Sequence, residues 1–198
     1  MRSRGLRRAA GSTRMSFRAA IGLLGTSLLV TSAASVAGAQ APSSEQLRLW
    51  LSGFERMPDA SAWRAMGPET VHVLRRAYED PAEAPWVRLR AVAAAGYFRT
   101  EDSRAFLRAV ARDPAQPELV VREALLALAR AFGAAAVADI GPFLEHPSTL
   151  VREAAALALG RIGDERARGA ARRRIGAEPD PTVREALERV ARSPARRR

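Results

Sequence analysis

The stretch VREAAALALG at residues 151–160 decides the fold of this chain, because close copies of it occur three more times. The copies are VRLRAVAAAG at 87–96, VREALLALAR at 121–130 and VREALERVAR at 183–192. Successive first valines of the four stretches lie 34, 30 and 32 residues apart. A repeat of this length is typical of a helical solenoid, in which each unit stacks only on its neighbours.

A proline precedes each copy and marks a turn. These prolines are Pro81, Pro114, Pro147 and Pro179, and the residues before them are Asp80, Asp113, His146 and Glu178. Proline ends a helix and acidic residues favour turns, so a first helix should end at each of these points. Apolar residues four and seven positions before the prolines form the face that this helix buries. Arg172 interrupts that face in the last unit, as suits a terminal repeat with a polar outer surface.

We therefore predict an all-α solenoid of about four two-helix units, at 67–100, 101–133, 134–163 and 164–192. Before it, residues 40–66 should hold an N-terminal capping helix and a connector. The stretch SSEQLRLWLSGFERM at 43–57 has apolar residues on a helical period, with Ser43 or Ser44 as the N-cap. After it, residues 193–198 should form a disordered basic tail.

The first 39 residues have the pattern of a secretory signal peptide. Six arginines precede the uncharged segment at 19–39, which ends in small residues. This pattern predicts cleavage after Ala39 and a periplasmic or secreted protein with no membrane span after cleavage. Retention of the segment as an anchor is the alternative, and either Met1 or Met15 could be the true start.

The net charge of +11 comes largely from this leader and from the last three residues. Without the leader, 26 arginines face 21 acidic residues, a net charge of +5. The high overall charge therefore gives little support to a nucleic-acid partner, which we do not expect. The chain has no cysteine, so packing alone must hold the domain together.

The third unit, HPSTLVREAAALALGRIGDERA at 146–167, resembles a HEAT repeat, in particular the short HEAT-like repeats named after phycobilisome lyases. The resemblance covers about residues 67–192 and implies a right-handed α-solenoid. It also implies a structural ladder in which the arginine after each first valine pairs with an acid of a turn. The arginines would be Arg88, Arg122, Arg152 and Arg184, and the acids Asp80, Asp113, Glu145 and Asp180 or their neighbours. Buried arginines need such partners for their five donors.

No catalytic, metal or cofactor site is expected. The two histidines, His72 and His146, lie far apart in sequence and there is no cysteine to complete a metal site. The chain has no nucleophile elbow and no phosphate-binding loop. We therefore expect a protein that is not an enzyme. The rivals are a HEAT-like enzyme of the lyase or glycosylase type, by analogy alone, or an envelope assembly or maturation factor.

Candidate partner-binding residues lie on the second helices. Glu123, Glu153 and Glu185 occupy equivalent positions and predict an exposed acidic row. Trp86, at the start of a second helix, is a candidate binding anchor. We expect an exported scaffold that binds an unknown protein through these residues.

An arginine-rich segment in the last unit is a candidate docking patch for an anionic component of the envelope. Its candidate residues are Arg166, Arg168, Arg172, Arg173 and Arg174. The alternative explanation is a solvated cap at the end of the solenoid.

Overall fold

The computed structural model describes residues 41–53 and 55–194. The predicted leader and the last four residues of the predicted tail lie outside the described residues. Helices are the only regular secondary structure within the described ranges. The all-α prediction is confirmed.

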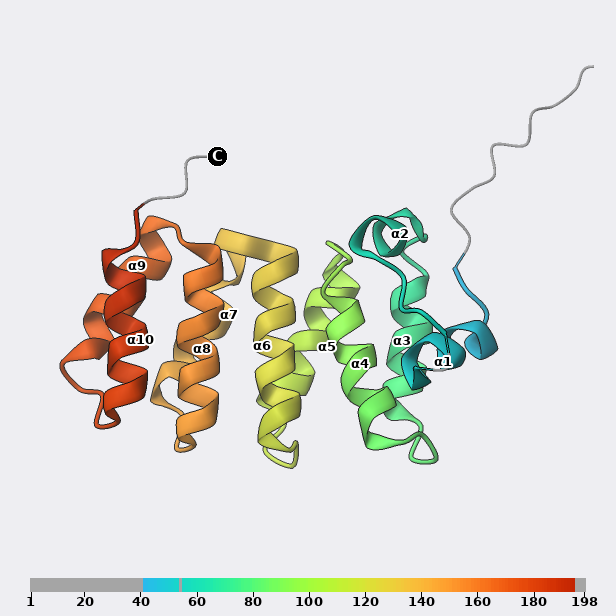
Figure 1. Ribbon diagram of the computed structural model, residues 1–198, viewed down its shortest axis with the longest axis horizontal. Helices are drawn as coiled ribbons and strands as arrows, with labels where there is room; N and C mark the ends of the chain where they lie inside the picture. The colour runs from blue at the N-terminus through green and yellow to red at the C-terminus, as the bar shows by residue number, and fades with distance from the viewer. Residues whose placement is uncertain (1–40, 54, 195–198) are drawn as a thin grey trace, which may run out of the picture. The chain divides into compact units, whose positions relative to one another are not determined.

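Helices pack in pairs, and the pairs follow one another along the chain (Figure 1). The first two pairs and the last are α3 (Thr70–Glu79) with α4 (Pro85–Ala95), α5 (Glu101–Arg112) with α6 (Glu118–Phe132), and α9 (Glu165–Ile175) with α10 (Pro181–Arg192). We call these pairs repeats 1, 2 and 4. The second helices α4, α6, α8 and α10 lie side by side, with α5, α7 and α9 behind them.

Repeat 3 has an irregular first half. It consists of η1 (Gly133–Ala136), α7 (Val137–Ile140) and η2 (Gly141–Glu145), followed by the regular second helix α8 (Thr149–Ile162). Pro142 lacks a backbone N–H and follows a glycine, so the pair cannot continue an α-helix. The sequence pattern predicts a single helix here, and the Gly141–Pro142 pair divides it.

Side-chain caps begin several of these helices. The side chains of Thr100, Ser148, Asp164 and Asp180 accept hydrogen bonds from backbone N–H groups in the first turn of α5, α8, α9 and α10. Such caps satisfy N–H groups that have no partner within the helix. The caps and the turn prolines together set where each helix of a pair begins.

The core is rich in alanine because the second helices approach one another closely. A Cβ atom on Gly96, the C-cap of α4, would lie 2.8 Å from the Cα of Ala127 on α6. Side chains larger than hydrogen do not fit there. Leu125, Leu128 and Leu159 fill the space between the helix layers and are completely buried.

Two short helices precede repeat 1. They are α1 (Ser44–Ser52), capped by the side chain of Ser43, and α2 (Ala60–Ala65), capped by Asp59. Trp63 of α2 is completely buried, with its ring centroid 5.9 Å from that of Trp50 and 6.3 Å from those of Tyr97 and Phe98. This aromatic cluster closes the N-terminal end of the stack.

One described stretch, Glu118–Glu145, is long and apolar enough to cross a membrane by length and composition alone. It contains α6 and the irregular half of repeat 3, and 56% of its apolar window is buried inside the domain. A core helix of a helical repeat gives the same signal, so we assign this stretch to the protein core.

Candidate interaction surface

Three of the four predicted ladder arginines bond to backbone carbonyl groups at the turn of their own repeat. Arg88 Nε donates to the Tyr78 carbonyl at 2.7 Å. Arg152 Nη1 donates to the carbonyls of His146 and Pro147, and Arg184 to those of Glu178 and Pro179. The Tyr78 carbonyl lies in the last turn of α3, where it has no partner within the helix, and the other carbonyls belong to the turns that follow η2 and α9.

The residue before each turn proline forms a hydrogen bond within its own turn. The side chain before each turn proline accepts a hydrogen bond from the backbone N–H two residues further on. The pairs are Asp80 with Ala82, Asp113 with Ala115, His146 with Ser148 and Glu178 with Asp180, at 2.9 to 3.1 Å. Four equivalent positions therefore share one turn geometry, although only two of them hold the same residue.

The prediction that the ladder arginines pair with Asp80, Asp113 and Asp180 is therefore wrong. Asp80 and Asp113 are short and are engaged by their own turns, and Asp113 also accepts from the side chain of Gln116. Asp180 is the N-cap of α10 and accepts from the N–H groups of Thr182 and Val183.

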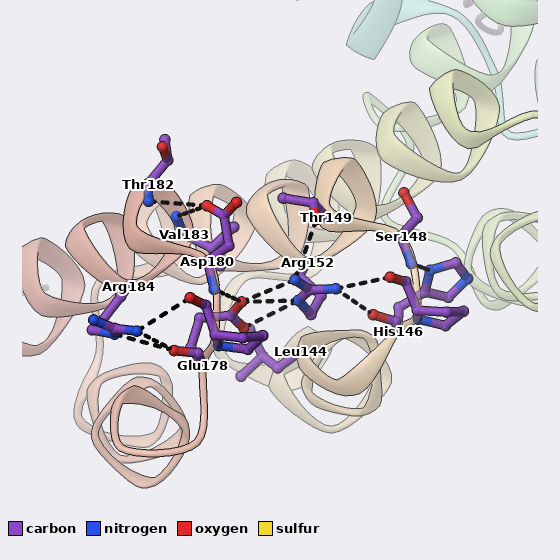
Figure 2. A network of polar contacts seen from close by, with 12 residues as sticks. Leu144, His146, Ser148, Thr149, Arg152, Glu178, Asp180, Thr182, Val183 and Arg184 are labelled. Atoms are coloured by element: carbon purple, nitrogen blue, oxygen red, sulfur yellow. Dashed lines mark hydrogen bonds and ion pairs between the residues drawn. The ribbon is translucent and has the colours of Figure 1, made fainter.

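One carboxylate does form a rung between neighbouring repeats, and it is Glu178. Figure 2 shows Arg152 of repeat 3 donating to both oxygens of this side chain, at 3.0 to 3.1 Å. Arg174 donates to the same carboxylate at 3.1 Å. Arg152 is 7% exposed and Glu178 is 2% exposed, so this ion pair is buried.

The Glu178 carboxyl is ionised in this setting. Burial raises the pKa of Glu178, but the hydrogen bonds from Arg152 and Asp180 and the charges of Arg152 and Arg174 outweigh burial. The pKa of Glu178 therefore lies below its ordinary value.

The equivalent rung between repeats 2 and 3 does not form within the described residues. Arg122 is half-buried and makes no hydrogen bond or ion pair with any described residue. The position equivalent to Glu178 is His146, which has no carboxylate and whose ring stacks on Phe143. Repeats 2 and 3 are instead joined by buried Asp139, which contacts Arg104 at 2.9 Å and Arg108 at 3.2 Å.

The predicted acidic row is only partly exposed. Glu185 is exposed, whereas Glu123 and Glu153 are half-buried. One carboxylate oxygen of Glu123 is buried, with no hydrogen-bond partner among the described residues. The expectation of three exposed acids is therefore wrong for Glu123 and Glu153.

Large apolar side chains are exposed on the second helices. Trp86 of α4 and Leu119 of α6 are each 57% exposed, and Leu157 of α8 is 39% exposed. Trp86 was expected on this surface from its place in the repeat. Leu119 and Leu157 were missed, because their positions in the other repeats hold small or polar residues and no apolar row marks them.

The arginine-rich segment divides into residues that face inward and residues that face solvent. Arg168 is buried, contacts Glu165 at 2.5 Å and donates to the Ser193 carbonyl. Arg174 is half-buried and donates to Leu144 and Glu178. A docking role for Arg168 and Arg174 is therefore contradicted, because their donors are engaged within the domain.

The other three arginines of this segment are exposed. Arg172 pairs with Glu165, and the hydrogen bonds from Arg168 and Arg172 hold the pKa of the Glu165 carboxyl below its ordinary value. Arg166 and Arg173 make no ion pair with a described residue. Of the five arginines in the predicted docking patch, Arg166 and Arg173 are therefore the two that are exposed and free of an ion pair with a described residue.

The histidines lie apart from one another in the structure. His72 is exposed on α3, with Glu69 at 3.5 Å and Asp102 at 3.9 Å. His146 is half-buried at its turn. The described residues contain no group of three or more His, Asp or Glu side chains that could hold a metal ion.

Comparison with known proteins bears on the second half of the stack. No curated protein sequence matches the chain. A family model described as HEAT repeats matches residues 115–192, which run from the turn of repeat 2 to the end of α10. Together with the paired helices, this match identifies residues 115–192 as a HEAT repeat domain.

Proposed function

We propose that this protein is a non-catalytic binding scaffold, and that the face formed by its second helices binds a segment of a partner protein. HEAT repeat domains are typical of protein-interaction scaffolds. The proposal depends on one observation: all three large apolar side chains that are exposed among the described residues belong to second helices.

This distribution distinguishes the two faces of the stack. Exposed Trp86, Leu119 and Leu157 come from three consecutive repeats, so they can contact one elongated partner. Tryptophan and leucine side chains gain free energy when they are removed from water, about 25 cal/mol per Å² of apolar area. Exposed tryptophan is also enriched among the residues that dominate binding energy.

The test is affinity capture by the full chain, compared with the double variant Trp86→Ala/Leu119→Ala. We expect the variant to lose proteins that the original chain retains. The matched control is Arg76→Ala/Arg112→Ala, which removes two exposed side chains from the first helices α3 and α5. Equal capture by the original chain and the Trp86→Ala/Leu119→Ala variant would overturn the proposal, provided that circular dichroism shows both to be folded.

The acidic residues supply a second comparison on the same face. Replacing exposed Glu185 and half-buried Glu153 by alanine should weaken capture if the partner segment carries basic residues. Unchanged capture would show that the glutamates do not contribute to binding, and it would leave the role of the apolar residues untouched.

We further propose that the scaffold acts outside the cytoplasm. The support is the basic and then apolar pattern of residues 1–39. Sequencing the N-terminus of the protein purified from its native cell should find Gln40 as the first residue, in the envelope fraction. An intact N-terminus in the cytoplasmic fraction would overturn this proposal and leave the binding proposal untouched.

A further inference from the structure

A groove runs between α9 and the irregular first half of repeat 3. Two hollows of about 300 and 220 Å³ form it, and they share the residues Gly141, Ala170 and Arg173. Because they share these residues, the two hollows adjoin one another along α9. The groove lies on first-helix elements and is therefore separate from the proposed second-helix surface.

Small side chains explain why the groove stays open. One wall comes from η1, α7 and η2 and includes Ala134, Ala138 and Gly141. A Cβ atom added to Gly141 would meet nothing within 4 Å. The longer side chains of this wall, Leu144 and Glu145, line the part of the groove nearer Arg174.

The other wall carries the two exposed arginines of the predicted docking patch. Arg166 and Arg173 both line the groove and lie on either side of Ala170. Neither forms an ion pair with a described residue, whereas Arg168, Arg172 and Arg174 all do. The acid in the lining is Glu145, at the end of the groove nearer Arg174. The groove therefore combines an apolar floor with two positive charges that remain available.

The distance between Arg166 and Arg173 determines how far apart two carboxylates of a ligand must be. Arg166 and Arg173 are seven residues apart on α9, so their Cα atoms are about 10 Å apart along the helix axis. A peptide in the polyproline II conformation rises about 3.1 Å per residue and has three residues per turn, so its side chains at positions i and i+3 lie on the same side, about 9 Å apart. Two carboxylates at positions i and i+3 of a peptide in this conformation match the two guanidinium groups.

We propose that this groove binds an extended acidic segment of a protein partner, with two carboxylates three residues apart and small apolar residues between them. Arg166 and Arg173 each bind one carboxylate, and the small side chains of the segment lie on the alanines of the floor. Arginine suits this role because its guanidinium group can donate two parallel hydrogen bonds to one carboxylate.

The test uses the full chain and two labelled peptides of equal composition, acetyl-GEAAEG-amide and acetyl-GEEAAG-amide. Fluorescence anisotropy should show at least threefold tighter binding of the first peptide, whose carboxylates have the matching spacing. The double variant Arg166→Gln/Arg173→Gln should weaken this binding at least tenfold. Raising the salt concentration from 50 to 300 mM should also weaken it, as screening requires.

The matched control is Arg161→Gln/Arg189→Gln, which removes two exposed arginines from α8 and α10 and should leave binding unchanged. Equal affinity for the two peptides, no binding of either, or an unaffected Arg166→Gln/Arg173→Gln variant would each overturn the proposal. Binding to anionic phospholipid vesicles that is lost in this variant, without peptide binding, would assign the groove to lipid instead. The Trp86→Ala/Leu119→Ala variant should bind the peptide normally, so failure of the scaffold surface and failure of this groove are distinguishable.

Discussion

The junction between repeats 3 and 4 and the junction between repeats 2 and 3 carry the same Val-Arg motif but are held differently. At the first, Arg152 crosses to buried Glu178 at the turn. At the second, His146 replaces the glutamate and Arg122 has no described partner, while Asp139 joins the first-helix elements to Arg104 and Arg108. A repeated residue thus has the same place in the fold without having the same energetic role, because its partner comes from the next repeat.

The largest expected effect comes from Arg152→Ala. This change leaves the Glu178 carboxylate buried beside Arg174 alone and removes the donors to two turn carbonyls. Removing one partner of a buried ion pair lowers the free energy of unfolding by about 3 to 5 kcal/mol. Urea unfolding followed by circular dichroism measures the loss.

The matched control for this change is Arg122→Ala at the other junction. Because Arg122 has no described partner and is half-buried, only the packing of its methylene groups is lost, and we expect a loss of about 1 kcal/mol or less. Equal losses in the two variants would show that the two junctions do not differ as described.

An intermediate effect is expected from Glu178→Gln, with a dependence on pH. At neutral pH the loss of charge-assisted hydrogen bonds should lower the free energy of unfolding by about 1.5 to 3 kcal/mol. The folded state lowers the pKa of Glu178, so its stabilisation is complete above the unfolded pKa of about 4.3 and is lost as pH falls through the lower folded value.

The difference between the original chain and Glu178→Gln should therefore shrink as the pH falls below about 4.3. Urea unfolding at a series of pH values measures it. A difference that stays constant down to acid pH would contradict the ionised state of Glu178.

The smallest expected effect is a gain from His146→Glu, which places a carboxylate at the position equivalent to Glu178. The new side chain can keep the turn hydrogen bond to the Ser148 N–H and can also reach toward Arg122. We expect the free energy of unfolding to rise by about 1 kcal/mol, which raises the melting temperature by about 2 to 4 °C.

The control is the same change in the Arg122→Ala background, where the gain should vanish. A gain that persists without Arg122 would show that it comes from the turn and not from a rung between repeats. This double-mutant comparison isolates the pairwise term.

The fold could be predicted from the sequence because its determinants are local and repeated. The Val-Arg stretches and the turn prolines mark where helices begin and end, and the apolar positions mark the buried faces. The broken first helix of repeat 3 was also visible in the Gly141–Pro142 pair. The repeat comparison favoured a continuous helix there, and the local chemistry of proline prevailed.

The contacts of charged residues could not be predicted in the same way. Glu178 reaches Arg152 because it is one methylene longer than the aspartates at equivalent turns, and because repeat 4 packs on repeat 3. Composition likewise groups Arg166 with Arg168, although α9 turns the first outward and the second inward. The direction of a side chain on a helix depends on which neighbour covers it, and a count of charges contains no such information.

The aromatic cluster around Trp63 has a consequence for how unfolding of this protein is observed. All three tryptophans, Trp50, Trp63 and Trp86, lie at or before the start of α4, so tryptophan fluorescence monitors only the N-terminal end of the stack. Circular dichroism monitors every helix. If the stack loses its repeats one at a time from the C-terminal end, the ellipticity should change before the fluorescence does, and the interval between the two transitions measures how strongly neighbouring repeats are coupled.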